Sequence, residues 1–334
     1  MKNKWITIRA YLYHLSFKKA ANFFVLYLSF MLSRALKKPI HWGFPTTLSI
    51  EPTTSCNLRC PECPSGLRSF TRPTGMLSEN LFKQIIGETK GYLTYLHLYF
   101  QGEPYLHPQF TDLVSLANQA GIFTSTSTNA HYLNEENVQK TLDSGLKQLI
   151  ISMDGITQEI YQEYRVGGKL SKVKEGLGLL LKLREERNLL FPRIVLQFLV
   201  TGQNEHQIPE IKDWAKEMGV DELQLKSTQI YHFENGSELI PKDLKYSRYI
   251  SDGNGKWKLK KKIENKCWRM WQGAVITWDG RVVPCCFDKD GYYVMGKVGE
   301  QTLGKIWKND KYRAFRNQIL EDRKQIEICK NCTE

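Results

Sequence analysis

The first 50 residues of this 334-residue chain contain no acidic side chain, and the whole chain contains no internal repeat or low-complexity tract. The lack of repeats argues against a solenoid or propeller, and a hydrophobic content of 41% is ordinary for a globular protein. Between Lys19 and Arg34 there are only 14 uncharged residues, whereas a membrane-spanning helix needs about 20. The sequence therefore predicts two globular domains, or one barrel with an appendage.

Positive charge is concentrated in the N-terminal segment. The net charge is +12, of which +8 lies in residues 1–50, and the other 284 residues hold 39 bases and 35 acids. Because the body is nearly balanced, we expect no nucleic-acid partner. Three interpretations of the arm at residues 1–46 stay open. It is a basic, aromatic-rich helix in contact with an anionic membrane surface, a hydrophobic helix packed on the following domain, or a segment for membrane spanning or export.

A strand-then-helix rhythm begins at residue 47. Apolar, β-rich segments predict six strands, at residues 47–53, 95–102, 123–129, 148–154, 194–200 and 222–228. Helical patterns lie between them, at residues 78–90, 109–120, 135–144, 157–187 (interrupted at Gly167–Gly168) and 205–218. Gly121, Gly145 and Gly219 each precede a strand, where helix ends commonly carry glycine.

Six successive β/α units predict an α/β fold with a parallel sheet and right-handed crossovers. We expect a partial (β/α)6 TIM-like barrel over residues 47–235, with an open doubly wound sheet as the alternative. A polar, lysine-rich connector follows at 236–266, and a small cysteine-bearing domain at 267–334. That domain is predicted to contain a β-hairpin, because the turn pair Asp279–Gly280 lies between alternating apolar residues.

Three cysteines, Cys56, Cys60 and Cys63, lie within eight residues, and no further cysteine occurs before Cys267. In a chain of this size, such spacing indicates metal ligation rather than disulfide bonds. A structural zinc ion normally has four ligands. Three thiolates suit an iron–sulfur cluster that leaves one iron open for a substrate or cofactor. Zinc with a further ligand from elsewhere is the alternative.

The C-x3-C-x2-C motif, on a loop after the first predicted strand, resembles that of the radical S-adenosylmethionine (SAM) superfamily. In that family the open iron chelates the amino and carboxylate groups of SAM. The resemblance implies that QGEP after the second strand receives the amino group, and that STN, SMDG and a later arginine hold the ribose and carboxylate. The implied SAM-contacting residues are Gln101, Gly102, Glu103, Pro104, Thr128, Asn129, Ser152, Asp154 and Arg165. Glu62 departs from the pattern, since an aromatic residue near the adenine often precedes the third cysteine.

A second set of cysteines offers four thiolates for a closed site: Cys267, Cys285, Cys329 and Cys332. The spacing Cys267-x12-Gly280-x4-Cys285 resembles the opening of a SPASM domain, which carries auxiliary [4Fe–4S] clusters. The small number of cysteines resembles the shortened form of this module, the twitch domain, with one fully ligated cluster. Cys286 is left without a predicted ligand role, and zinc is again the alternative.

The resemblance implies two [4Fe–4S] clusters and SAM as cofactors, and a reductant such as flavodoxin or ferredoxin. Reductive cleavage of SAM would give a 5′-deoxyadenosyl radical that abstracts a hydrogen atom from the substrate. Oxygen-sensitive clusters imply the reducing cytoplasm, at the inner face of the membrane if the arm binds lipid. The sequence identifies no catalytic acid or base.

The substrate is predicted from what precedes the first cysteine. Peptide-modifying relatives recruit their substrates through an N-terminal module, and the 55 residues before Cys56 leave no room for it. We therefore expect oxidation or rearrangement of a sugar, an alcohol or a lipid-associated small molecule, with the auxiliary cluster as electron acceptor. Peptide modification with a separate recognition partner is one alternative, and a non-catalytic iron–sulfur or zinc scaffold is another.

Overall fold

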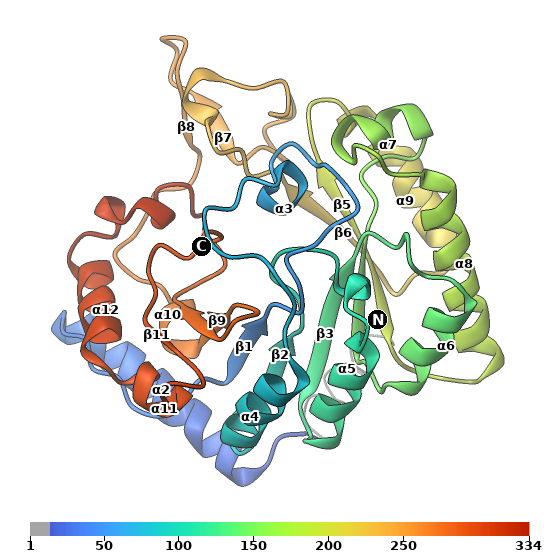
Figure 1. Ribbon diagram of the computed structural model, residues 1–334. Coiled ribbons are helices and arrows are strands. Elements are labelled where there is room, and N and C mark those ends of the chain that lie inside the picture. Colours follow the sequence, from blue (N-terminus) through green and yellow to red (C-terminus); the bar gives the residue numbers. More distant parts are fainter. Residues whose placement is uncertain (1–13, 334) are drawn as a thin grey trace.

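The computed structural model describes residues 14–333, so Lys2, Lys4 and Arg9 of the predicted arm lie outside the described residues. A curved sheet with strand order β11-β10-β9-β1-β2-β3-β4-β5-β6 forms its centre (Figure 1). The predicted barrel strands are β1 (Thr47–Ile50), β2 (Tyr95–His97), β3 (Phe123–Thr128), β4 (Gln148–Ser152), β5 (Arg193–Val200) and β6 (Glu222–Ser227). Each pairs in parallel with the next. The predicted α/β fold with a partial TIM-like barrel is confirmed.

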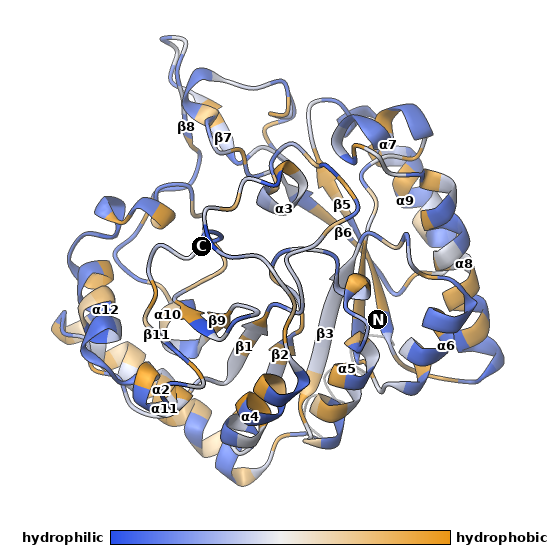
Figure 2. Ribbon diagram, in the orientation of Figure 1, coloured by the Kyte–Doolittle hydropathy of each residue, from blue (hydrophilic) through white to orange (hydrophobic). Residues whose placement is uncertain are grey.

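Helices cover the outside of this curve and turn their hydrophobic residues toward the sheet (Figure 2). They are α4 (Glu79–Thr89), α5 (Phe110–Gln119), α6 (Glu135–Asp143), α7 (Gln158–Tyr164), α8 (Leu170–Glu186) and α9 (Ile208–Glu217). The short helix α3 (Pro64–Leu67) lies apart from them, directly after Cys63, and its Leu67 is exposed (Figure 1). Polar caps start several of them; Ser78 and Asn134 accept backbone hydrogen bonds at the beginnings of α4 and α6. Gly121, Gly145 and Gly219 adopt φ values of 68°, 77° and 72° before β3, β4 and β6, as the sequence predicted.

Side chains of the strands alternate between the helix-facing core and the concave interior. In β1, Leu48 and Ile50 are fully buried in the core, whereas Thr47 and Ser49 are less buried and line an interior cavity. This alternation follows from the pleat, because successive strand residues point to opposite faces of a sheet. The concave interior therefore carries many polar side chains, and they surround a space that a ligand could occupy.

The C-terminal region extends the barrel sheet. After α10 (Arg269–Gln272), β9 (Gly273–Ile276) pairs in parallel with β1, and β10 (Arg281–Val283) and β11 (Gly296–Lys297) continue the sheet antiparallel. The hairpin of β9 and β10 was predicted, and Gly280 in its turn has φ 87°. The pairing with β1 was not predicted. The remaining elements of this region are α11 (Leu303–Trp307), α12 (Asp310–Asp322) and the single turns η4 (Arg323–Gln325) and η5 (Glu327–Cys329).

The lysine-rich segment predicted as a solvated connector has structure of its own. Strands β7 (Tyr249–Ser251) and β8 (Trp257–Leu259) form an antiparallel hairpin that stands beside the barrel (Figure 1). Tyr249 packs with Ile230, Phe233 and Ile240 in a small separate core. The polar composition concealed this hairpin, because its strands are short and few of its residues are apolar.

Helix α2 (Phe17–Leu36) crosses the base of the barrel, at the N-terminal ends of the strands. Near its start, Lys19 Nζ donates to the carbonyl of Gly121, before β3. Farther along, three of its rings contact Trp268 edge to face, with centroids 5.2–5.9 Å apart: Phe23, Tyr27 and Phe30. These contacts agree with the interpretation in which the arm packs on the following domain. Helix α2 also keeps an exposed apolar face. Among the described residues, no helix has the length and apolarity to cross a membrane.

Candidate functional site

The three N-terminal cysteines lie on the loop after β1, at the C-terminal edge of the barrel strands. Cys60 is buried and the other two are half-buried, and all three pack with Leu58 and Tyr164. Burial raises the pKa of Cys56 to about 12 and also raises that of Cys60. A buried thiol loses its proton when a metal ion binds the sulfur atom in place of that proton. The loop therefore fits the ligation of a cluster.

Each of these sulfur atoms lies close to a polar side chain from a different segment: the loop after β2, the end of β3 or the end of α7. The pairs are Asn129 Nδ2 with Cys56 Sγ, Arg165 Nη1 with Cys60 Sγ, and Gln101 Oε1 with Cys63 Sγ, each 3.9 Å apart. All three partners are residues for which SAM contact was predicted. The fold thus brings side chains that are distant in sequence to the same side of the cysteine loop.

The segment from Gln101 to Pro104 is fixed against the chain that leads into the cysteine loop. Gly102 has φ 74°, and a Cβ there would lie 2.2 Å from the carbonyl oxygen of Thr53 and 2.8 Å from that of Ser55. Only glycine fits such a close backbone approach. The backbone N–H of Glu103 donates to the same Ser55 carbonyl at 2.7 Å.

The carboxylate of Glu103 is buried and joins the ends of β2 and β3. It accepts hydrogen bonds from the backbone N–H of Tyr105 (3.2 Å), the hydroxyl of Thr128 (2.7 Å) and the backbone N–H of Asn129 (2.8 Å). Burial raises its pKa, while these donors favour the charged form. A carboxylate has about four acceptor positions, so one remains for a cation such as an amino group.

Asp154 and Arg165 form a buried ion pair beside Cys60. The other oxygen of Asp154 accepts the backbone N–H of Leu199 at 2.7 Å, which fixes the carboxylate. Burial alone would lower the pKa of Arg165, but Asp154 raises it well above the usual range, so the guanidinium is a permanent cation here. Ser152, at the end of β4, is buried, and within residues 14–333 it makes no hydrogen bond to the cysteines.

Glu62, the departure from the expected aromatic residue, anchors a neighbouring segment. Its carboxylate accepts the backbone N–H of Tyr231 at 2.9 Å. Burial and the nearby Cys63 raise the pKa of Tyr231, which indicates that this ring lies close to the cysteine loop. An aromatic side chain therefore reaches the site from the segment after β6, where the sequence offered no signal for it.

Three of the four predicted ligands in the C-terminal region, Cys267, Cys329 and Cys332, lie near the buried side chain of Arg323. Its Nη2 atom is 3.0 Å from Cys332 Sγ. Burial lowers the pKa of Arg323, but the nearby thiols, that of Cys267 first, raise it above its usual value. Burial has the opposite effect on a thiol, and it raises the pKa of Cys329 to about 11. Sequence reasoning missed Arg323, because a single arginine without a spacing pattern gives no signal of such a contact.

The spacing of the cysteines bears on which metal they would hold. Among the described residues, no group of three or more His, Cys, Asp or Glu side chains is close enough to bind one metal ion. A zinc site needs its ligands around a single point, whereas the cysteines of a cubane bind different iron atoms.

An interior cavity of about 550 Å³ lies on the concave side of the sheet. Its walls come from β1, β2, β4, β6 and β9, and the segment Pro284–Cys286 forms one side. Cys285, a predicted ligand of the auxiliary cluster, is therefore part of the wall. The size is within the range of about 300–1,000 Å³ that is common for small-molecule sites.

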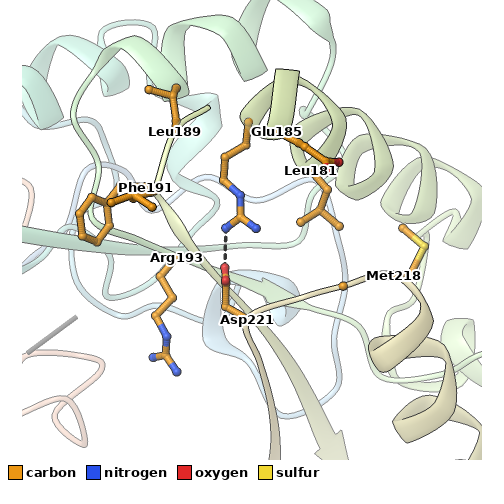
Figure 3. A pocket seen from close by; sticks show the side chains of 10 residues that line it. Leu181, Glu185, Leu189, Phe191, Arg193, Met218 and Asp221 are labelled. Atoms are coloured by element: carbon orange, nitrogen blue, oxygen red, sulfur yellow. Dashed lines mark hydrogen bonds and ion pairs between the residues drawn. The ribbon is translucent and has the colours of Figure 1, made fainter. Parts of the chain in front are cut away.

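A second hollow, of about 380 Å³, lies at the base of the barrel between α8 and the starts of β5 and β6 (Figure 3). The ion pair of Arg184 with Asp221 crosses it, and Leu189 and Phe191 line its edge. It is at the opposite end of the strands from the cysteine loop. Since an ion pair already satisfies its principal charges, we assign it a structural role.

Two family models match the chain. The model described as radical SAM superfamily matches residues 50–215, and the model of the SPASM iron–sulfur cluster-binding domain matches residues 267–333. The chain belongs to the radical SAM superfamily and carries a C-terminal SPASM domain. Its cofactors are accordingly SAM, the [4Fe–4S] cluster that binds SAM, and an auxiliary iron–sulfur cluster in the SPASM domain. The prediction of SAM and iron–sulfur clusters as cofactors is confirmed.

Curated relatives have diverse reactions. The tungsten-containing aldehyde ferredoxin oxidoreductase cofactor-modifying protein of Pyrococcus furiosus is 28% identical, over 80% of this chain and 82% of that protein. The PqqA peptide cyclase of Bradyrhizobium diazoefficiens is 24% identical, over 90% and 82%. The SAM-dependent 2-deoxy-scyllo-inosamine dehydrogenase of Niallia circulans is 22% identical, over 85% and 91%.

Among solved structures, SuiB of Streptococcus suis bound to SAM is similar in fold. Its TM-score is 0.63 at 16% identity, and the match covers 90% of this chain and 74% of SuiB. This likeness supports the architecture of barrel and SPASM domain, and it does not extend to the substrate.

Proposed function

We propose that this radical SAM enzyme oxidises or rearranges a small molecule held in the interior cavity, with the auxiliary cluster as electron acceptor. The observation that carries the proposal is the position of Cys285, which lines the cavity together with strand residues of the barrel. An electron leaving a substrate in this cavity would have a predicted cluster ligand at its wall. That arrangement favours a reaction in which the substrate ends oxidised.

SAM and its cluster supply a carbon-centred radical that abstracts a hydrogen atom from the substrate. The role of the protein is to hold SAM at the ends of the strands and to exclude water from the site. In this proposal Glu103 accepts the amino group of SAM, and Asn129 and Arg165 hold the ribose and carboxylate. Their shared position beside the cysteine loop supports these roles. Flavodoxin or ferredoxin would supply the electron.

The relatives support two substrate classes. A dehydrogenase of a small cyclic compound matches most of this chain, as does a cofactor-modifying protein, and both favour a small molecule. A peptide cyclase matches 90% of the chain, so a peptide presented by a separate recognition partner is the second candidate. The cavity volume of about 550 Å³, which suits a small molecule, favours the first candidate.

Release of 5′-deoxyadenosine separates these candidates. Reconstituted protein with dithionite and SAM is incubated anaerobically with sugars, sugar phosphates, alcohols or lipid extracts, and in parallel with synthetic peptides. We expect a small molecule to raise release at least about tenfold over the rate without substrate. Stimulation by peptides alone would contradict the small-molecule proposal. No release under any condition would favour the scaffold alternative.

We further propose that the protein works in the cytoplasm with the outer face of α2 against anionic lipid. Exposed apolar residues gather on this helix, including Phe17, Phe24, Leu28, Met31 and Leu36. Basic residues lie beside them and are exposed too: Lys18, Arg34, Lys37 and Lys38. Because residues 1–50 contain no acid, nothing in this segment offsets the attraction to an anionic surface.

Glutamate at two positions of this face is expected to weaken lipid binding strongly. In the variant Phe24→Glu/Leu28→Glu, two apolar contacts are replaced by charges that anionic lipid repels, and binding should weaken at least about tenfold. Co-sedimentation with phosphatidylglycerol vesicles measures it. Leu190→Glu is the matched control, because Leu190 and Phe24 are both 65% exposed and Leu190 lies away from α2. Equal binding to neutral vesicles, or a dimer held through α2, would contradict the proposal.

A further inference from the structure

One guanidinium connects two distant parts of the SPASM domain. Arg323 directly follows α12, in the turn η4, and it is only 1% exposed. Its Nη1 atom donates to the carbonyl oxygen of Lys266 at 2.7 Å, one residue before Cys267. Its Nη2 atom donates to Cys332 Sγ at 3.0 Å. The side chain of Arg323 therefore links the segment that leads to the first predicted ligand with the last predicted ligand itself.

The chain around Arg323 is fixed by an asparagine from the same segment. The backbone N–H of Arg323 donates to Asn265 Oδ1 at 3.1 Å, and Asn265 Nδ2 donates to the carbonyl oxygen of Glu321 at 2.5 Å. Asn265 thus holds the end of α12 against the residues that precede Cys267. Because its backbone and its Nη1 atom are both held, Arg323 presents Nη2 to Cys332 in a defined orientation.

A buried guanidinium beside a thiolate stabilises negative charge on the sulfur atom. Cys332 is 7% exposed, so water screens its contact with Arg323 only weakly. Arginine is always a cation, and a hydrogen bond from a charged donor is roughly twice as strong as a neutral one. A thiolate ligand becomes more negative when its cluster gains an electron. A hydrogen bond to that thiolate therefore favours the reduced form of the cluster.

The first set of cysteines has a weaker contact of this kind. Arg165 Nη1 lies 3.9 Å from Cys60 Sγ, and the charge of Arg165 is shared with Asp154 in a buried ion pair. At the C-terminal set the guanidinium is 3.0 Å from the sulfur atom. The site that is expected to accept an electron therefore has the stronger stabilisation of added negative charge.

We propose that Arg323 is a positioning residue of the auxiliary cluster, and that its hydrogen bond to Cys332 raises the reduction potential of this cluster. In the proposed oxidation, the substrate loses a hydrogen atom to the 5′-deoxyadenosyl radical, and then one electron to the auxiliary cluster and one proton to water. A higher potential of the cluster makes the electron transfer more favourable. This inference rests on the proposed function for the direction of electron flow, and it adds the residue that sets the driving force.

Redox titration followed by electron paramagnetic resonance tests the inference. The full chain is reconstituted as the Cys56→Ala/Cys60→Ala/Cys63→Ala variant, so that the signal comes from the auxiliary cluster. Adding Arg323→Met should lower the equilibrium constant for reduction at least about tenfold, which is a fall of about 59 mV in midpoint potential. Arg313→Met is the matched control, because Arg313 is an exposed arginine of α12, and it should leave the potential unchanged.

Two further measurements separate this role from a purely structural one. Arg323→Lys keeps a cation with N–H donors, so it should bring the potential back toward that of the chain with Arg323. Iron content is determined in each variant, so that potentials are compared at equal loading. Pulsed resonance on protein with Arg323 intact and its arginines labelled with ¹⁵N is independent of how the variants fold. It should detect a guanidinium nitrogen coupled to the reduced cluster, and Arg323→Lys should remove that coupling.

The outcomes distinguish this inference from the proposed function. Equal potentials with Arg323 and with methionine in its place, or no coupled guanidinium nitrogen, overturn the inference. Release of 5′-deoxyadenosine with small molecules is measured separately, in chains that keep all three N-terminal cysteines. If small molecules stimulate release and the potential is independent of Arg323, only the inference is lost. If the potential depends on Arg323 and no small molecule stimulates release, the role of Arg323 stands and the proposed function falls.

Discussion

Alanine at Cys60 is expected to abolish reductive cleavage of SAM while the chain still folds. Removing one of three thiolates leaves the first cluster without a stable ligand set, so release of 5′-deoxyadenosine should fall at least about 10³-fold. The protein loses only one small buried group, which costs about 1 kcal/mol in the free energy of unfolding. Anaerobic assays with dithionite measure the first effect, and denaturant titration measures the second.

Iron analysis extends this experiment to the ligand assignment. The parent chain should hold about 8 iron atoms, and the Cys56→Ala/Cys60→Ala/Cys63→Ala variant about 4, because each [4Fe–4S] cluster contains four. Cys286→Ala is the control for iron content, since no ligand role is assigned to Cys286. An unchanged iron count in the triple variant would mean that these cysteines hold no cluster. Loss of iron in Cys286→Ala would show that the auxiliary site uses it.

Alanine at Gly102 is expected to weaken both folding and SAM binding. The new Cβ would lie 2.2 Å from the Thr53 carbonyl oxygen, and φ 74° is unfavourable for alanine by about 1–2 kcal/mol. Clash and strain together should lower the free energy of unfolding by about 3 kcal/mol or more. Because Gly102 precedes Glu103, the displaced backbone should also raise the dissociation constant of SAM at least about tenfold.

Gly167→Ala separates the two causes. Gly167 has φ 82°, and a Cβ there would meet nothing within 4 Å, so this variant carries the backbone strain without the clash. It should cost only about 1–2 kcal/mol in the free energy of unfolding. Equal costs for the two variants would show that the contact with Thr53 and Ser55 yields easily. The close approach would then not be what fixes the QGEP segment.

Local patterns were sufficient to predict the barrel. The strand at 148–152, for example, is an apolar run between Gly145 and a polar strand end, and that pattern needs no knowledge of distant residues. Distant pairing was not predictable in this way. The contact of β9 with β1 depends on how the whole sheet curves, and nothing in the short sequence of β9 specifies a parallel partner near the start of the chain.

Site residues that belong to a sequence motif could be named in advance. Site residues that only the fold brings together were missed. The cysteines and the QGEP segment have fixed spacings, so their residue numbers could be given in advance. The cavity wall had a weaker signal, since Thr47 and Ser49 alternate with apolar residues in β1 and this period of two marks an inward polar face. Arg323 had none, because its neighbours come from other elements.

The parallel pairing of β9 with β1 sets an order of events during synthesis. At about 5–20 residues per second, the ribosome needs on the order of 10–45 s to reach β9 after completing β1. Until then the nascent chain exposes an unpaired edge of β1, directly before the loop that carries Cys56. Exposed strand edges attract other strands. The chain therefore passes through an interval during synthesis in which this edge is open to mispairing, before β9 completes the sheet.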